Sequence, residues 1–528
     1  MTKQALTDLV LDASIAATLC ADTPGNDLSL ALERVCVQGM RLWLYTGEIH
    51  DTLTRVQAKI STTESVKSMT ISDARQCLDQ KLPKFQWLAA LSQDMECADD
   101  ADPLAVALIC SIERLGGNAG ILSGMPSRLD RGTPFTDVDS VFPSEFEPRV
   151  DFIDLKTQQD RIRPTLESGI HRVLHHGRYV MGAEIEALEE RLAQMAGVEH
   201  CVCVSSGTDA LLMTLMALEI GPGDEVITSP FTFFATAEVI ALLGATPVYA
   251  DIDPQTFNID AAKIEAAITG RTRAIMPVSL YGQCAEMDEI NAIGQRHSVP
   301  VIEDAAQSFG ATYRGQRSCA LSEIACTSFF PAKPLGAYGD GGACFTPDEN
   351  LALKLRQIRD HGQDRRYHHA HLGVNGRLDT MQAAVLLAKL DIFEDEINRR
   401  QVVAQRYAQQ LAVLENESKL ALPMVRSHNT SSWAQYTIRV QCRDELQQAL
   451  TKSQIPTAVH YPVPLYRQPA LAQSETHCPQ SDRAADEVLS LPMHPYLGEM
   501  AQERVSQTLA EALSCLLVGS DQHAGAKI

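Results

Sequence analysis

The chain has 528 residues, well beyond the roughly 100–200 residues of one domain, so more than one folded core is predicted. Its 45 Lys and Arg against 67 Asp and Glu give a formal charge of -22, which disfavours broad binding to nucleic acids or anionic membranes. It has no apolar run of about 18 residues, Asp8 and Asp12 interrupt any signal peptide, and the 14 cysteines form no CxxC pair. We therefore expect a cytoplasmic protein without a membrane partner, a zinc ribbon or a disulfide framework.

Residues 1–142 are followed by PSEFEPR, which we interpret as a linker over 143–150. Within this region, LVLDASIAATL predicts a strand ending near Asp12, LWLYTGEIHDTL a helix bearing Glu48, and DPLAVAL a helix starting near Asp102. This order resembles a small α/β PIN-like nuclease domain. The resemblance implies that the three acids bind Mg²⁺ or Mn²⁺, hard ions that prefer carboxylate oxygens.

The PIN-like pattern also expects a further acid near position 125, where this chain has Met125. Loss of that acid favours a degenerate docking or regulatory domain over a nuclease. RNA is therefore expected as a partner only if the domain is active.

From about 201 to 305, strand candidates alternate with helical patterns, which predicts βαβ units and a mainly parallel sheet covered on both faces. The strand candidates are CVCVSS, EVITSP, TPVYADI, AIMPVSL and PVIEDAA. A periodic stretch over 378–413 predicts a long helix that leads to a smaller α+β region with strand candidates AQYTIRV and TAVHYPV. We expect a large domain over 151–393 and a small domain with a tail over 394–528.

Two motifs suggest a cofactor site at the sheet's carboxyl edge. CVCVSS leads into SGTDAL, which puts Gly207, Thr208 and Asp209 at a helix start suited to a phosphate, although a simple helix cap fits equally. Asp304 ends the apolar strand of IEDAAQSFG, where a carboxylate can face a pyridinium nitrogen. An ordinary helix-capping Asp is the alternative there.

The third motif, TSFFPAKPLGAYGDGGACF, carries one lysine, Lys333, in a loop rich in Pro and Gly between two strand-like segments. A lysine buried near cations or apolar walls loses proton affinity, so its free amine can form an imine. Ser328 precedes it and can donate a hydroxyl to a phosphate. Alone, this lysine fits a surface loop; with Asp304 and SGTDAL in chain order, it favours catalysis.

These segments, with PFTFFATAE, VYADID, PVSLYGQ, GVNGRLDTMQAA and VHYPVPLY, resemble the DegT/DnrJ/EryC1/StrS sugar aminotransferases over about 150–518. The resemblance implies a homodimer or higher homo-oligomer of the fold-type I architecture with pyridoxal phosphate (PLP), in which a large domain precedes a small α+β domain. It implies Lys333 as the Schiff-base lysine, Asp304 as the pyridinium partner, Gln307 at the 3-hydroxyl and Phe233 stacked on the ring. Thr208, Ser328 and Asn375 would hold the phosphate, Asn375 from the neighbouring subunit.

HGQDRRYHH and LPMHPYLG further resemble bacterial transaminases that convert UDP-2-acetamido-2-deoxy-3-keto-glucuronate to its 3-amino sugar with L-glutamate, for surface polysaccharides. That resemblance implies that Arg377, from the partner subunit, His460 and Tyr461 reach the sugar nucleotide. A surface Arg377 and a core His460 remain alternatives, as does a UDP-4-keto-hexose aminated at C4. Related sugar dehydratases carry His in place of Lys333, so transamination is favoured.

Overall fold

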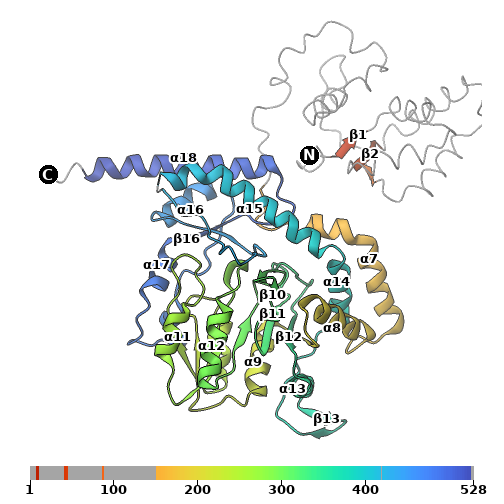
Figure 1. The fold of residues 1–528 in the computed structure, drawn as a ribbon. Helices are drawn as coiled ribbons and strands as arrows, with labels where there is room; N and C mark the ends of the chain where they lie inside the picture. The colour runs from red at the N-terminus through yellow and green to blue at the C-terminus, as the bar shows by residue number, and fades with distance from the viewer. Residues whose placement is uncertain (1–7, 11–40, 46–85, 89–149, 418, 525–528) are drawn as a thin grey trace, which may run out of the picture. The chain divides into compact units, whose positions relative to one another are not determined.

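The computed structural model describes residues 8–10, 41–45, 86–88, 150–417 and 419–524 (Figure 1). The chain divides into two compact units, Met1–Arg149 and Val150–Ile528. In the first unit, β1 (Asp8–Val10), β2 (Arg41–Tyr45) and β3 (Gln86–Leu88) form a parallel sheet in that order. The helix predicted for LWLYTGEIHDTL is wrong at its start, because residues 42–45 lie in β2 and pair with both neighbouring strands. The predicted metal ligands Asp12, Glu48 and Asp102 lie outside the described residues.

The second unit is built around a sheet that follows the predicted alternation. Two sheets, β6-β5-β7 and β4-β12-β11-β8, are joined by the parallel bridges Ile275–Val301 and Val278–Asp304. The sheet is mainly parallel, as predicted, but β12 runs antiparallel to both of its neighbours. The strands are β4 (His200–Val204), β5 (Glu225–Thr228), β6 (Thr246–Tyr249), β7 (Thr272–Met276), β8 (Ile302–Asp304), β11 (Ile324–Ser328) and β12 (Gly342–Thr346).

Helices cover both faces of the sheet. Because successive side chains of a strand point to opposite faces, alternate residues pack in different cores. On β4, Val202 and Val204 pack in one core with α9 and α13, whereas Cys201 and Cys203 pack in another with α8 and α14. The two cysteines are thus packed strand residues. The helices are α8 (Ala183–Ala196), α9 (Gly207–Ala217), α10 (Ala235–Leu242), α11 (Ala261–Ala267), α12 (Met287–His297), α13 (Glu349–Arg359) and α14 (Thr380–Leu390).

The long helix predicted over 378–413 is interrupted. α14 ends at Leu390, and α15 (Phe393–Asn416) begins after a turn in which the Ile392 N–H donates to the Lys389 carbonyl. The change of direction lets Phe393 pack fully buried beside Phe309, with ring centroids 5.5 Å apart. Tertiary packing has therefore divided a segment whose periodicity alone reads as continuous. α7 (Leu155–His176) packs against α14.

The carboxyl-terminal part has its own core, formed mainly by residues from 403 to 513. α15 and α18 (Glu499–Ala524) lie side by side there (Figure 1). β15 (Tyr436–Arg439) pairs antiparallel with β16 (Val488–Leu491), and α16 (Arg443–Lys452) and α17 (Pro479–Glu487) complete the fold. The shorter elements of the unit are η3 (Leu280–Gly282), β9 (Thr312–Tyr313), β10 (Gln316–Arg317), β13 (Gln363–Arg365), β14 (His368–His369), η4 (Leu465–Arg467) and η5 (Pro469–Leu471).

The strand predicted for TAVHYPV is wrong. Only Ala458 pairs, in an isolated bridge to Ser490, and the chain then leaves the sheet. Pro462 and Pro464 have no N–H to donate to a neighbouring strand, so pairing cannot continue through them. Among the helices of the described residues, none has the length and apolarity needed to span a bilayer.

Candidate active site

The predicted cofactor residues gather at the carboxyl edge of the sheet. Asp304 ends β8, Ser328 ends β11, and the chain leaves β4 at Val204 to enter α9 at Gly207. These strands are parallel to one another, since β4 and β11 both run antiparallel to β12, so their carboxyl ends meet at one edge. Ligands of open α/β sheets bind at such an edge.

The helix start at α9 lies close against Ser328. A Cβ on Gly207 would lie 2.6 Å from the Ser328 Cβ, so only glycine allows this close approach. The Ser206 hydroxyl caps the helix by accepting from the Asp209 N–H at 3.0 Å. The Asp209 carboxylate accepts from the hydroxyls of Ser205 and Ser206, so it orders the turn. The Gly207 and Thr208 N–H groups precede this capped N–H at the positive end of the helix, which suits an anion.

Asp304 is 4% exposed and has defined partners. It accepts from the Thr236 hydroxyl at 3.0 Å and from the Ala306 N–H at 3.2 Å. Burial raises the pKa of Asp304, while these two hydrogen bonds and the nearby Lys333 charge oppose the rise. A buried carboxylate held in this way is prepared to accept from a cationic N–H.

Lys333 lies in a tight turn between β11 and β12. Its N–H donates to the Phe330 carbonyl at 2.9 Å, and a Cβ on Gly336 would meet the Pro331 oxygen at 2.5 Å. Burial lowers the pKa of Lys333, and the charge of Asp304 opposes this fall. The unprotonated amine of Lys333 is therefore more populated than that of a lysine in water.

Gln307 and Tyr461 complete the floor of the site. The Gln307 Oε1 accepts from the Tyr281 N–H at 2.8 Å, and its Nε2 donates to the Tyr461 hydroxyl at 3.2 Å. Phe233 is 55% exposed, and its ring centroid lies 6.1 Å from that of Tyr461. An aromatic face with one open side is suited to stacking against a planar ring.

His460 comes from the carboxyl-terminal part and reaches the same place. Its Nδ1 lies 2.9 Å from the Ser490 hydroxyl, and the Tyr281 hydroxyl donates to its carbonyl. Burial, helped by the Lys333 charge, lowers the pKa of His460 to about 4. Its imidazole is therefore neutral near pH 7.

Asn375 and Arg377 follow the β13–β14 hairpin, which extends from the body of the unit (Figure 1). Asn375 is exposed and bridges Asp360 through the main chain. Arg377 is half-buried beside Val204 and forms an ion pair with Asp360. Within the single chain, Arg377 is thus bound at the end of β4 rather than free on the surface.

Two supporting residues were not singled out from the sequence. Thr236 lies in PFTFFATAE soon after β5, and this position brings its hydroxyl to the Asp304 carboxylate at the carboxyl edge. Ser490 lies in a β16 that the sequence did not predict, and no local pattern connects it with His460 across 30 positions.

These residues fit PLP. The helix start and the Ser328 hydroxyl suit a phosphate, the Asp304 carboxylate suits a pyridinium, and Lys333 offers an amine of lowered pKa. The absence of a Cβ at Gly207 lets the helix start and the Ser328 hydroxyl lie close enough to bind one phosphate together.

Comparison with known proteins supports this interpretation. A UDP-2-acetamido-2-deoxy-3-oxo-D-glucuronate aminotransferase of Pseudomonas aeruginosa is 58% identical over 348 residues, or 66% of this chain and 96% of that protein. The crystal structure of S. venezuelae DesV in complex with a ketimine intermediate is 41% identical, with a TM-score of 0.67, and covers 69% of this chain and 99% of DesV. The crystal structure of Bacillus subtilis NtdA with bound cofactor PMP is 25% identical, with a TM-score of 0.64. It covers 96% of this chain and 100% of NtdA.

The expected fold-type I architecture, aminotransferase chemistry and PLP cofactor are thereby confirmed for the second unit. The model of the DegT/DnrJ/EryC1/StrS aminotransferase family matches residues 161–510. The chain therefore belongs to the DegT/DnrJ/EryC1/StrS aminotransferase family.

Proposed function

We propose that the chain transfers the amino group of L-glutamate to the C3 ketone of UDP-2-acetamido-2-deoxy-3-keto-glucuronate, for surface polysaccharide biosynthesis. The observation that carries the proposal is the 58% identity to the P. aeruginosa aminotransferase, which extends over 96% of that protein. A second relative, 43% identical, is a UDP-N-acetyl-3-dehydro-alpha-D-glucosamine 3-aminotransferase of Acidithiobacillus ferrooxidans. Both relatives act at position 3 of a UDP-linked amino sugar.

When bound, PLP carries the amino group from donor to acceptor and accepts electron density from the reacting carbon. We assign Lys333 to hold it and to take and return the proton at Nζ. The lowered pKa of Lys333 supports this role, because a general base works best when its pKa lies near the working pH.

Asp304 is assigned to the pyridine nitrogen, which it keeps protonated by accepting its hydrogen bond. Thr236 and Ala306 fix the carboxylate from the other side. Gly207, Thr208 and Ser328 are assigned to the phosphate, Gln307 to the 3-oxygen and Phe233 to the ring face. Each role follows from the side chain's chemistry and its place at the sheet edge.

His460, Tyr461 and Arg377 are assigned to the sugar nucleotide. Because the pKa of His460 is about 4, it binds through hydrogen bonds rather than as a cation. Arg377 supplies the positive charge that a uronate carboxylate or a diphosphate needs.

We further propose a homodimer in which Asn375 and Arg377 act in the partner's site. The exposed hairpin before them supports this, since Tyr367 and Leu372 are 81% and 89% exposed at its tip and base. Large apolar side chains so placed favour burial against a second copy.

The substrate assignment is tested with two ketones. Purified protein is supplied with L-glutamate and either the UDP-linked 3-keto-uronate or a UDP-4-keto-hexose, and Lys333→Ala protein serves as the blank. We expect kcat/KM to favour the 3-keto-uronate. Preference for the 4-keto sugar would transfer the assignment to C4 amination.

For residues 1–142 we propose a PIN-like domain with weak or no nuclease activity. The parallel β1-β2-β3 sheet supports an α/β fold there. RNA digestion by the full chain with Mn²⁺, compared with Asp12→Asn, tests it: robust cleavage that the substitution removes would show an active nuclease.

A cytoplasmic location also stays a prediction.

A further inference from the structure

The orientation of the Gln307 amide is set from behind the site. Its Oε1 is already occupied by the Tyr281 N–H at 2.8 Å, so the amide presents Nε2 to the site. One Nε2 hydrogen reaches the Tyr461 hydroxyl at 3.2 Å, and the other remains for a further acceptor. Gln307 is therefore a donor here, and suits an ionised 3-oxygen rather than a hydroxyl.

The turn that carries the Tyr281 N–H has an unusual backbone. Tyr281 and Gly282 have φ of 58° and 112°, in the left-handed region. A Cβ on Gly282 would lie 2.6 Å from the Trp433 nitrogen, so the turn is packed directly against residues 431–433. Such a conformation persists only where its surroundings hold it.

Ser432 provides that support and also touches Gln307. Its hydroxyl donates to the Gln307 carbonyl at 2.7 Å, and its N–H donates to the Gly282 carbonyl at 2.9 Å. Ser432 is fully buried. One residue thus binds both the main chain of Gln307 and the turn that orients its side chain.

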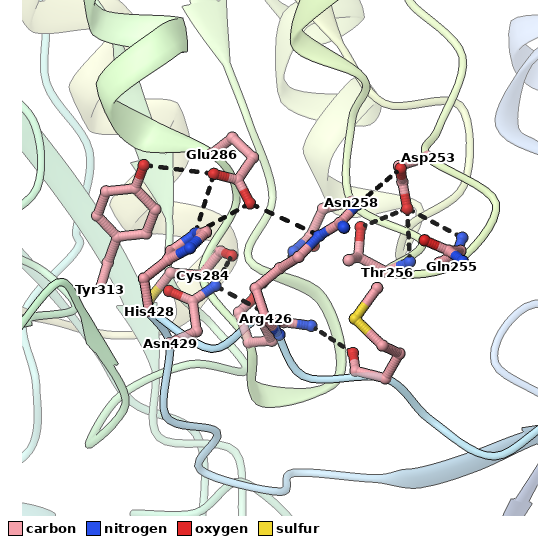
Figure 2. Close-up of polar contacts among 12 residues, drawn as sticks. Asp253, Gln255, Thr256, Asn258, Cys284, Glu286, Tyr313, Arg426, His428 and Asn429 are labelled. Atoms are coloured by element: carbon pink, nitrogen blue, oxygen red, sulfur yellow. Dashed lines mark hydrogen bonds and ion pairs between the residues drawn. The ribbon is translucent and has the colours of Figure 1, made fainter.

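Ser432 lies near the end of a segment, residues 424–433, whose side chains and main chain bind residues 253–286. Figure 2 shows Arg426 directed toward Asp253 and His428 directed toward Glu286. The Arg426 Nη2 lies 3.2 Å from the Asp253 carboxylate, and the His428 Nε2 lies 3.1 Å from the Glu286 carboxylate. The Gln283 Oε1 accepts a hydrogen bond from the Arg426 main-chain N–H at 2.7 Å.

The same segment is also fixed at its far end. The Trp433 indole N–H donates to Gln401 on α15 at 2.9 Å, and Arg400 donates to the Trp433 carbonyl at 2.8 Å. Ser432 is therefore held in place between two sets of contacts.

We propose that Ser432 is a positioning residue, which fixes the Gln307 amide so that its Nε2 donates to the 3-oxygen of the cofactor. The inference rests on the assignment of Gln307 to that oxygen. A donor there stabilises the ionised oxygen and lowers the pH at which the bound chromophore loses its proton.

The test is a pH titration of the visible absorption band of the PLP-loaded protein. Ser432→Ala should raise the titration midpoint, by about half to one pH unit for a weakened hydrogen bond to a charged group. Ser506→Ala is the matched control, because its buried hydroxyl also donates at 2.7 Å, but to the Gln410 side chain on α15. The control should titrate as the unmodified protein does.

A double-mutant cycle separates positioning from general loosening. Gln307→Ala should show the full shift, and adding Ser432→Ala to it should cause no further shift, because Ser432 acts through Gln307. Ser432→Cys replaces the hydroxyl with a slightly larger thiol that is a weak donor. It should give an intermediate shift, which covers the case in which Ser432→Ala fails to fold.

An unchanged midpoint in folded Ser432→Ala or Ser432→Cys protein, or a shift that persists without Gln307, would overturn the inference. If the unmodified protein showed no visible band with PLP, the cofactor assignment itself would fail. A band whose midpoint does not respond to Gln307→Ala would instead reject the role of Gln307.

Discussion

At the scale of single residues, Asp304 makes the sharpest prediction. Asp304→Asn keeps the shape that Thr236 and Ala306 contact but removes the charge to which we assign the protonation of the pyridine nitrogen. We expect cofactor binding to persist and kcat to fall by about 10²-fold or more. Steady-state kinetics with glutamate measure this. Asp348→Asn, which only changes the cap of α13, should leave kcat unchanged.

His460 gives a prediction about pH and stability. Its pKa is about 4 in the folded chain and 6.5 when unfolded, so between these values the unfolded state binds the proton. Protonation of His460 therefore favours unfolding. It should lower the free energy of unfolding by up to about 3 kcal/mol as pH falls from 6.5 to 4. Denaturation of unmodified and His460→Gln protein over this range measures it. Equal slopes of stability against pH would show that His460 titrates normally.

At the scale of elements, the turn from β4 into α9 should tolerate no side chain at position 207. Gly207→Ala places a Cβ against Ser328, which must shift the turn or close the phosphate site. We expect the Kd for PLP to rise by about tenfold or more, equivalent to 1.4 kcal/mol. Gly221→Ala is the control, because nothing lies within 4 Å of its Cβ. Absorbance titration compares the two, and equal affinities would contradict the assignment.

The elements also show what the sequence could and could not predict. Strands β4 to β8 were predictable because each is a short apolar run between turn signals, and Asp304 and Lys333 because charge is rare in such surroundings. The break between the two helices at Ile392 could not be predicted from the sequence, because it depends on Phe393 packing against Phe309. The role of Ser432 could not be predicted either, because it arises from contacts with residues 282 and 307, which are far away in the chain.

At the scale of the whole molecule, the proposed homodimer with shared active sites predicts complementation between inactive subunits. Mixing Lys333→Ala with Arg377→Ala gives heterodimers in which one site has its own Lys333 and the partner's intact Arg377. With random exchange, half of the dimers regain one of two sites, so activity should approach about a quarter of the unmodified level.

The control pair for this experiment is Lys333→Ala with Asp304→Asn. Both residues act in the chain's own site, so no mixed dimer has a complete site and no activity should return. Absence of recovery in the first pair, with exchange verified by mass, would mean that Arg377 acts within its own chain.

The last prediction concerns the division between the two units. Every assigned cofactor residue lies beyond position 200, and the second unit begins at Val150, which is buried in the core formed mainly by residues 403–513. Removal of residues 1–142 should therefore leave the PLP absorption band and the glutamate-dependent turnover within about twofold of their values in the full chain. The melting temperature should be nearly unchanged.

A longer truncation, of residues 1–154, should behave differently. It removes Val150 from that core, Phe152, whose carbonyl accepts from the Met493 N–H and whose ring lies 6.4 Å from His460, and Asp154, which caps α7. The lost apolar burial and helix cap should together cost about 2–4 kcal/mol, visible as a lower melting temperature and weaker cofactor retention. If the shorter truncation already causes this loss, residues 1–142 contribute directly to the aminotransferase and are more than an independent domain.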